Sequence, residues 1–304
     1  RERLRHRGSG DSAGAVYLAG FTSGASPGYT NTGWQDVWVR KYDPDGTEVW
    51  THQFGTTGGD EGRGLAVDAT GAVYVTGSTG GALPGQTNIG GSDVFVRKYD
   101  SDGTEVWTRQ FGTSRGDDGY GIATGRSGAV YVTGTTHWAF PGYTYAGNRD
   151  IFVRKYDADG TELWTRQFGT TAIDASEGVA VDPTGAVYLT GITQEALPGY
   201  SNLGRFDAFV RKYDSDGTEV WTRQFGTAEY DYGYGVAVDP SGAVYVGGNT
   251  SGVLPGQTSA GDYDAFVRKY DSDGTELWTQ QFGTGTLDTG RGYCGRRLRC
   301  LPHW

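Results

Sequence analysis

The chain lacks several patterns that whole classes of protein require. No stretch approaches the roughly 18 consecutive apolar residues of a bilayer-spanning helix, so we expect no membrane span. Only four histidines occur, and the two inside the repeats described below, His52 and His137, occupy unrelated positions. The sequence therefore offers no Ser/His/Asp or Cys/His catalytic set and no histidine-based metal site.

Methionine is absent, and the only cysteines, Cys294 and Cys300, lie in a C-terminal segment that departs from the rest of the chain. We interpret both ends as truncations or reading-frame slips, so the missing signal peptide says nothing about secretion. The two cysteines likewise do not report the redox compartment of the repeats. The net charge of -10 disfavours a nucleic-acid partner.

What the chain does contain is one unit of 57 residues, repeated five times without insertion or deletion. The tetrapeptide Gly-Ala-Val-Tyr begins at Gly14, Gly71, Gly128, Gly185 and Gly242. A fixed period of this length predicts supersecondary units that share one continuous core. We place the copies at about 11–67, 68–124, 125–181, 182–238 and 239–293, with aberrant segments at 1–10 and 294–304 outside them.

Each copy predicts four strands. In the second copy they are residues 64–68, 72–76, 93–99 and 104–111, which are rich in Val, Tyr, Phe and Trp and are separated by Gly, Asp, Ser and Thr. Both short connections are of hairpin type, so neighbouring strands should be antiparallel. If Tyr99 and Thr104 flank the last turn, Lys98 lies opposite Glu105 and Val96 lies opposite Trp107.

Four antiparallel strands in each of several tandem copies predict an all-β fold, a β-propeller with one four-stranded blade per copy. Strand one is intact only four times, beginning at Gly64, Gly121, Gly178 and Gly235. Residues 9–11 and residues 289–293 each retain part of the strand-one pattern, so either segment could supply the fifth copy of strand one. We therefore expect five blades, with a fragment of a larger propeller as the alternative. A closed ring predicts a monomer, whereas an open fragment exposes edge strands and should self-associate.

The strand Val73-Tyr74-Val75-Thr76 and the segments Asp-Ala-Phe-Val-Arg-Lys-Tyr-Asp and Asp-Gly-Thr-Glu-Val-Trp resemble the bacterial SBBP β-propeller repeat family over about residues 11–293. The resemblance implies a propeller in a secreted or cell-surface protein, with no common activity. The Asp-x-x-Gly-Thr-x-x-Trp hairpin is also similar to the tryptophan-docking motif of quinoprotein propellers. That similarity implies a structural role in blade packing for Trp50, Trp107, Trp164, Trp221 and Trp278.

Alternating strand direction places the long loop between strands two and three at the same end of the blade as the connection to the next blade. Binding residues concentrate on such loops. Two series of aspartates recur there: Asp60, Asp117, Asp174, Asp231 and Asp288 before strand one, and Asp36, Asp93, Asp150, Asp207 and Asp264 before strand three. They are candidates either for accepting backbone N–H bonds within their own turns or for a ring of carboxylates that holds a cation or a polar ligand.

Aromatic residues also occur in these loops, where they suit stacking on sugars or a protein hot spot, and equally the anchoring of the loops. The candidate ligand-binding set is Trp34, Trp138, Tyr143, Tyr200, Tyr232 and Tyr263, and Tyr29, Tyr145, Phe206 and Tyr230 accompany it. The loops differ between copies, which fits either selected specificity or drift.

The Asp-x-Asp-Gly turns, of which 43–46 is the first, resemble a calcium loop only superficially. An EF-hand loop needs Gly at position six and a bidentate Glu at position twelve, whereas here Gly is fourth and a strand follows at once. A hairpin with a positive-φ glycine explains the pattern. We expect no cofactor, with calcium as the alternative.

These observations favour a non-enzymatic binding or interaction module for a glycan or protein ligand, in which similar copies act together through multivalency. The alternative is a carbohydrate-active hydrolase or lyase that uses rim carboxylates. An asymmetric active site should break the repeat, and only Glu61 and Asp118, each beside a repeated Asp, are candidates for this.

Overall fold

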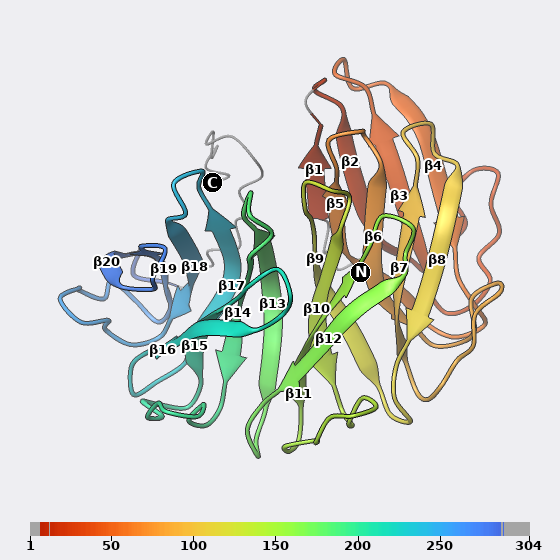
Figure 1. Cartoon of the computed structure of the whole chain (residues 1–304). Coiled ribbons are helices and arrows are strands. Elements are labelled where there is room, and N and C mark those ends of the chain that lie inside the picture. The colour runs from red at the N-terminus through yellow and green to blue at the C-terminus, as the bar shows by residue number, and fades with distance from the viewer. Residues whose placement is uncertain (1–6, 12, 287, 289–304) are drawn as a thin grey trace. The chain divides into compact units, whose positions relative to one another are not determined.

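The computed structural model describes residues 7–11, 13–286 and 288, and these form twenty β-strands in five four-stranded antiparallel sheets with no helix. The described chain therefore contains no helix that is long and apolar enough to cross a membrane. It divides into two compact units: Arg1–Tyr145 with Arg149–Phe168, and Ala146–Asn148 with Gly169–Trp304. Within each sheet the strands lie side by side in chain order (Figure 1).

Unit 1 contains three sheets. The first consists of β1 Arg7–Gly10, β2 Val16–Thr22, β3 Asp36–Tyr42 and β4 Glu48–Phe54. The second consists of β5 Asp60–Val67, β6 Val73–Thr79, β7 Asp93–Tyr99 and β8 Glu105–Phe111. The third consists of β9 Asp117–Thr124, β10 Val130–Thr136, β11 Asp150–Tyr156 and β12 Glu162–Phe168.

Unit 2 contains two sheets. One consists of β13 Asp174–Val181, β14 Val187–Thr193, β15 Asp207–Tyr213 and β16 Glu219–Phe225. The other consists of β17 Asp231–Val238, β18 Val244–Thr250, β19 Asp264–Tyr270 and β20 Glu276–Phe282. Every sheet thus has the same simple meander, which confirms the predicted four-stranded propeller blade.

The core lies between neighbouring blades rather than within one blade. Every residue of β6 is buried, whereas the first two residues of β8 are exposed. Tyr74 of the second blade packs in one apolar cluster with Phe152 and Tyr156 of the third. Both faces of a central strand meet a neighbouring sheet. Such strands therefore carry near-continuous apolar runs in the sequence instead of alternating apolar and polar residues.

The first blade includes a strand that the sequence placed outside the repeats. The main chain of β1 pairs with β2, with Arg7 opposite Ala19 and Gly10 opposite Val16. Residues 7–10 stand one period before residues 64–67 of β5, so they form the second half of strand one. Strand pairing is made by backbone groups, which tolerate the unusual sequence here. The competing remnant at 289–293 lies outside the described residues.

The predicted register of the last hairpin is wrong by one residue at Glu105 and by two residues from Trp107 onward. Glu105 lies opposite Tyr99 and Trp107 opposite Lys98, with a bulge between these pairs that leaves Val106 as the extra residue. Val96 faces Arg109 instead of Trp107. Glu105 forms its ion pair with Arg97, at 3.2 Å between Nη1 and Oε2. A bulge cannot be read from alternation alone, because it inserts one residue into one strand only.

The Asp-x-Asp-Gly turns are closed by hydrogen bonds of the protein itself. Asp100 Oδ1 accepts the backbone N–H groups of Asp102 and Thr104, at 3.0 and 2.8 Å, and Gly103 has a φ of 89°. This is the positive-φ hairpin glycine that the sequence predicted. The described residues contain no group of three or more His, Cys, Asp or Glu side chains that could hold a metal ion.

In the turns between strands one and two, an aspartate carboxylate accepts several hydrogen bonds, and its ionisation makes them depend on pH. In unit 2, Asp182 accepts bonds from Thr184 N and Oγ1, from Ala186 N and from the Tyr188 hydroxyl, at 2.8, 2.5, 3.0 and 3.1 Å. Burial opposes ionisation of this carboxyl, but these bonds outweigh burial and lower its pKa. The ionised form therefore stabilises the fold.

We expect Asp182→Ala to lower the free energy of unfolding by about 2 kcal/mol at pH 7, because four bonds to a charged acceptor are lost. A folded pKa below the unfolded value of about 3.9 means that this stabilisation is complete above about pH 5 and disappears as the pH falls through the folded pKa. The difference between wild type and variant in thermal unfolding should therefore shrink below about pH 4. Asp159→Ala, at an exposed turn residue, should show no such trend.

Candidate functional site

The first series of rim aspartates lies in the interior. Asp60, Asp117, Asp174 and Asp231 are each 0% exposed. Asp60 accepts Thr56 N at 2.6 Å and the hydroxyl of Thr79, so it clamps the connection between two blades to strand two. Asp288 accepts Thr284 N in the same way. This is the hydrogen-bonding role that the sequence offered as one of two alternatives.

The second series clamps the long loop. Asp93 Oδ2 accepts Ile89 N at 2.8 Å and Gln110 Nε2 at 3.0 Å, while Gln110 Oε1 accepts Leu83 N at 2.9 Å. All five members of this series are 0% exposed: Asp36, Asp93, Asp150, Asp207 and Asp264. The nine members of the two series that are 0% exposed therefore form no ring of carboxylates open to solvent, whereas Asp288 is partly exposed.

Burial has an electrostatic consequence for these clamps. It raises the pKa of Asp117 to about 6, although bonds from Thr136 and Thr113 oppose the shift and the charge of Asp93 adds to it. Burial also raises the pKa of Asp231. These carboxyls are enclosed by their own loops, so a raised pKa here reflects a desolvated clamp rather than an acid poised beside a substrate.

The two acids that break the repeat are ion-pair partners. Arg63 Nη2 lies 2.9 Å from Glu61 Oε2, and Arg63 Nη1 lies 3.1 Å from Asp118 Oδ1. The guanidinium also lies 4.9 Å from the ring centroid of Tyr120. Burial of the guanidinium opposes its charged form, but the neighbouring Asp118, Tyr120 and Glu61 outweigh burial and raise the pKa of Arg63 above its usual value. Glu61 and Asp118 thus join β5 to β9 across two blades of unit 1.

Three of the five repeated tryptophans, Trp50, Trp107 and Trp221, join neighbouring blades. The indole N–H of Trp107 donates to Ala158 O of the next blade at 3.1 Å, and that of Trp221 donates to Ser272 O at 3.0 Å. Trp50 reaches Ser101 O at 3.5 Å. Trp164 packs on Tyr131 with centroids 6.0 Å apart, and Trp278 on the last strand is 40% exposed.

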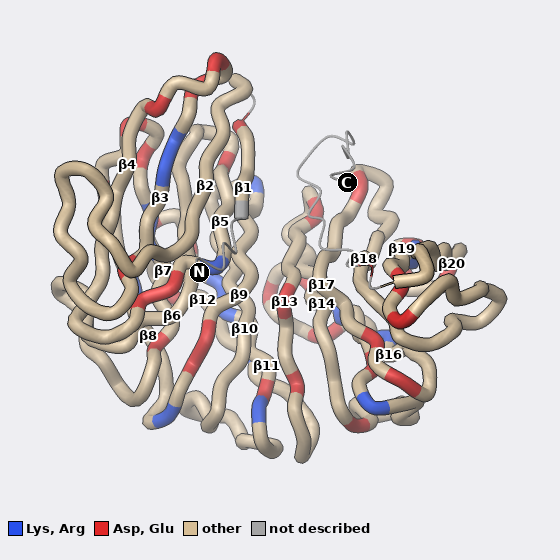
Figure 2. The backbone as a smooth tube through the Cα atoms, turned by 180° about the vertical axis from the view of Figure 1, so that it is seen from behind, with Lys and Arg blue, Asp and Glu red and all other residues tan. Residues whose placement is uncertain are grey.

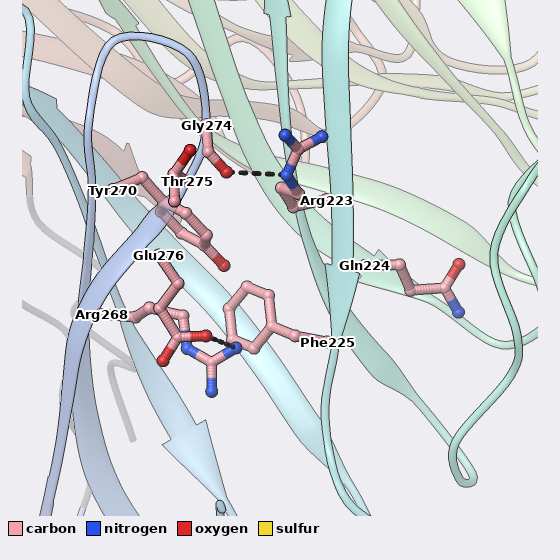
Figure 3. A pocket seen from close by; sticks show the side chains of 8 residues that line it. All are labelled: Arg223, Gln224, Phe225, Arg268, Tyr270, Gly274, Thr275 and Glu276. Atoms are coloured by element: carbon pink, nitrogen blue, oxygen red, sulfur yellow. Dashed lines mark hydrogen bonds and ion pairs between the residues drawn. The ribbon is translucent and has the colours of Figure 1, made fainter.

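The pocket in Figure 3 belongs to this packing between blades. Arg223 Nε donates to Gly274 O at 2.7 Å, and Arg268 Nη1 lies 3.3 Å from Glu276 Oε2. The same bond recurs in unit 1, where Arg109 donates to Gly160 O at 2.7 Å. The hollow is thus a seam between blades, and two of its lining atoms, Arg268 Nε and the Tyr270 hydroxyl oxygen, have no hydrogen-bond partner among the described residues.

The predicted loop aromatics divide into two groups. Tyr143 and Tyr200 donate their hydroxyls to Thr165 O and Thr222 O, so they anchor their loops to the outer strand. Trp34 and Trp138 are exposed, at 82% and 45%. Tyr232 and Tyr263 are half-buried and in contact, with ring centroids 6.4 Å apart.

Tyr232 stands in the middle of a row of aromatic rings along β17 of unit 2. The rings of Tyr230 and Tyr232 are parallel within 6° at 6.2 Å, and those of Tyr232 and Tyr234 within 2° at 5.8 Å. Phe206 lies 5.7 Å from Tyr230 and 5.9 Å from Tyr232. We call Phe206, Tyr230, Tyr232, Tyr234 and Tyr263 the tyrosine row.

The local backbone explains the row. Residues 230, 232 and 234 alternate along one strand, so their side chains share a face. The pairing of β17 with β18 shifts between Gly233 and Gly235, which makes Tyr234 the extra residue of a bulge. Bulges redirect side chains and are frequent beside functional sites.

The row occurs in one blade only among the described residues. At the positions of Tyr230, Tyr232 and Tyr234 the three preceding copies carry Gly59, Glu61 and Arg63, then Gly116, Asp118 and Tyr120, then Ile173, Ala175 and Glu177. Tyr120 is the single tyrosine among these nine residues. The sequence singled out four members of the row as loop aromatics but missed Tyr234. The signal that finds it is the spacing of three tyrosines at every second position.

The row is electrically neutral and flanked by one ion pair. Burial raises the pKa of Tyr232, and the neighbouring Tyr263 and Tyr234 raise it further, so its hydroxyl stays protonated. Arg205 donates to the Tyr230 hydroxyl at 3.0 Å and lies 3.8 Å from Glu229. Acidic residues recur along both units, as expected from the net charge (Figure 2).

Comparison with known proteins identifies the repeats. The family model described as Beta-propeller repeat, SBBP, matches residues 49–84, 106–138 and 220–255. The regulatory protein FlaEY of Caulobacter vibrioides is 30% identical over 211 residues, which cover 62% of this chain and 22% of that protein. An uncharacterized WD repeat-containing protein of Acanthamoeba polyphaga mimivirus is 27% identical over 179 residues, covering 49% of this chain and 13% of that protein. The chain therefore spans less than a quarter of the length of either relative.

Among solved structures, a protein of unknown function from Dyadobacter fermentans is similar with a TM-score of 0.54 and 14% sequence identity. The match covers 95% of this chain and 85% of that protein. At this identity the likeness concerns the fold alone.

Proposed function

Because this chain is built from SBBP beta-propeller repeats with one copy-specific aromatic surface, we propose that it is a non-enzymatic glycan-binding module whose tyrosine row carries the ligand. The observation that carries the proposal is the set of three parallel rings of Tyr230, Tyr232 and Tyr234 at the start of β17. Each tyrosine combines an apolar ring with a hydroxyl, so a row of them can pack on the C–H faces of sugars and exchange hydrogen bonds with their hydroxyls.

The placement of the row supports a binding role. Its members are half-buried, which holds the rings in position while part of each stays accessible. Rigid rings on a strand lose little conformational entropy when a ligand binds. Because the row belongs to one blade, the proposal replaces a set of identical repeated sites with one distinct site.

The aspartate clamps favour binding over catalysis. A glycosidase needs two carboxyl groups that flank a bond of the substrate. In this chain Asp60, Asp117 and their repeats are enclosed by loop hydrogen bonds, and Glu61 and Asp118 are held by Arg63. The relative from Caulobacter vibrioides is named a regulatory protein, which also agrees with a module that binds rather than catalyses.

The proposal is tested by binding to neutral polysaccharides, first on a glycan array and then by isothermal titration with a soluble ligand found there. We expect Tyr232→Ala and Tyr234→Ala each to weaken binding by about tenfold or more, because each removes a ring from the row, and hot-spot aromatics contribute on this scale. The matched control is Tyr120→Ala. Tyr120 occupies the position of Tyr234 two copies earlier but lies under Arg63, so its loss should leave affinity unchanged.

Unchanged affinity in both row variants, with circular dichroism showing intact folding, would reject the tyrosine row as the site. Release of reducing ends by the wild-type protein would instead establish the alternative, a hydrolase or lyase. The location outside the cell or at its surface, which the family resemblance implies, is part of the same proposal, because polysaccharides are exposed there.

A further inference from the structure

A second copy-specific surface lies in unit 1, on the long loops of the blade β9–β12. We call it the basic aromatic patch and define it by Arg115, His137, Trp138, Tyr145 and Arg149. Arg115 comes from the loop between β8 and β9, and the other four come from the loop between β10 and β11. In the other described copies each of these five positions carries a different residue type, namely Gly, Ala, Glu, Gln, Ser, Thr, Asn, Phe or Tyr.

The side chains form two contacting groups, with Arg115, Trp138 and Tyr145 in one and His137 with Arg149 in the other. The Arg115 guanidinium lies 5.1 Å from the ring centroid of Trp138, and the rings of Trp138 and Tyr145 are 5.4 Å apart at 38°. Arg149 Nε donates to His137 Nε2 at 3.0 Å. Trp138 is 45% exposed, so part of its ring remains open to solvent.

His137 orients one of the two arginines. Its Nδ1 lies 2.7 Å from Gly116 O, which can only accept, so Nδ1 carries the hydrogen. Nε2 therefore keeps its lone pair and accepts the Nε–H of Arg149. This leaves the terminal amino groups of Arg149 held in a defined direction, ready for a bidentate partner.

The two arginines lack the carboxylate partners that several other arginines of the molecule have. Arg63, Arg97, Arg154, Arg211 and Arg268 each lie within 4.0 Å of an acidic side chain. No such ion pair exists for Arg115 or Arg149 among the residues that the structure describes. The adjacent acids, Asp117 and Asp150, are 0% exposed and clamp their own loops. Because Arg115 and Arg149 form no ion pair with a carboxylate of the described residues, and the chain has a net charge of -10, their guanidinium groups can attract an anionic ligand.

We propose that the basic aromatic patch binds an acidic polysaccharide, with a sugar carboxylate paired to Arg149 and Arg115 and the ring of the same sugar packed on Trp138. A carboxylate matches the fork of a guanidinium in two parallel hydrogen bonds. The indole beside that fork favours a hexuronate over an acidic peptide, because the hexuronate presents a rigid apolar face next to its charge. The net charge disfavours a nucleic acid. The site is in a different unit from the tyrosine row and differs from it in ligand chemistry.

The test uses the full chain and isothermal titration with polygalacturonate, and dextran as the uncharged comparison. We expect polygalacturonate to bind and dextran to show at least tenfold weaker binding at this patch. Trp138→Ala and Arg149→Ala should each weaken polygalacturonate binding at least tenfold, and raising the salt concentration should weaken binding by the wild type. Arg126→Ala, at an exposed arginine in the β9–β10 turn of the same blade, is the matched control and should change affinity less than twofold.

His137 is a positioning residue, and a double-mutant cycle tests that role. His137→Ala should weaken binding about threefold to tenfold in the wild-type background and have no effect in the Arg149→Ala background, because it acts through Arg149. Equal effects in both backgrounds would contradict the role, since general loop damage would persist without Arg149.

The proposal is overturned if polygalacturonate fails to bind, or if Arg149→Ala binds it as tightly as the wild type. Equal or tighter binding of polyglutamate or of an oligothymidylate would also overturn it, in favour of an acidic protein or a nucleic acid. Tyr234→Ala should retain polygalacturonate binding, which separates this site from the tyrosine row.

Discussion

Trp107→Ala should lower the free energy of unfolding by about 3–5 kcal/mol, because it removes a large side chain that is only 8% exposed and wedged between two blades. The substitution also removes the bond to Ala158 O and the ring contacts with Tyr74 and Tyr156, at 6.1 and 6.3 Å. Thermal and urea unfolding followed by tryptophan fluorescence and circular dichroism would measure the loss.

Trp278→Ala is the matched control for this experiment. Trp278 occupies the same repeat position on β20 but is 40% exposed, so its loss should cost about 1 kcal/mol. Trp107→Phe separates the two contributions, since it keeps a ring and removes only the N–H donor, at a cost of about 1 kcal/mol plus some packing. Equal losses in Trp107→Ala and Trp278→Ala would show that the indole does not act by joining blades.

Gly248→Ala should be nearly as disruptive, by about 3 kcal/mol or more, and should also abolish binding at the tyrosine row. A Cβ at Gly248 would lie 1.8 Å from Tyr232 O, a distance that no real structure accepts. The backbone of β17 would have to move, and Tyr232 and Tyr234 would move with it. Thermal unfolding and glycan titration of the same variant would check both effects.

The adjacent Gly247→Ala supplies the control. The nearest atom to its new Cβ would be Phe266 O at 3.9 Å, and the other blades carry Ala19, Thr76, Thr133 and Thr190 at this position. We expect a change within about 0.5 kcal/mol and unchanged binding. A melting temperature of Gly248→Ala equal to that of Gly247→Ala would contradict the close approach of the two strands at the bulge.

Some elements of the fold could be predicted closely from the sequence. The third strand of the second blade was expected at residues 93–99 and is β7 Asp93–Tyr99. The first strand was expected from Gly64 but begins at Asp60, because the glycines around the bulge imitate a loop. The bulge at Val106 displaced the predicted Lys98 and Glu105 pair in the same way. Periodic apolar residues define a strand, whereas an inserted residue leaves no periodic trace.

The candidate sites also divide into residues that the sequence could single out and residues that it could not. Loop aromatics such as Tyr232 and Trp138 stood out as differences between copies, whereas Tyr234 lay hidden in a strand. The aspartates drew attention by repetition, yet repetition reflected a structural need for buried hydrogen-bond acceptors in every blade. The basic aromatic patch could not be predicted, because Arg115 is more than twenty residues from His137 and only folding brings their loops together.

By itself, the sequence determined the number of strands in each copy, their antiparallel order and the residues that face neighbouring blades, because these follow from local hydrophobic pattern and turn chemistry repeated at one period. Only the tertiary structure decided which polar side chains were enclosed and which remained open to a ligand. That outcome depends on contacts between segments distant in the chain, such as Arg63 with Asp118 or Trp107 with the turn of the next blade, which no local pattern encodes.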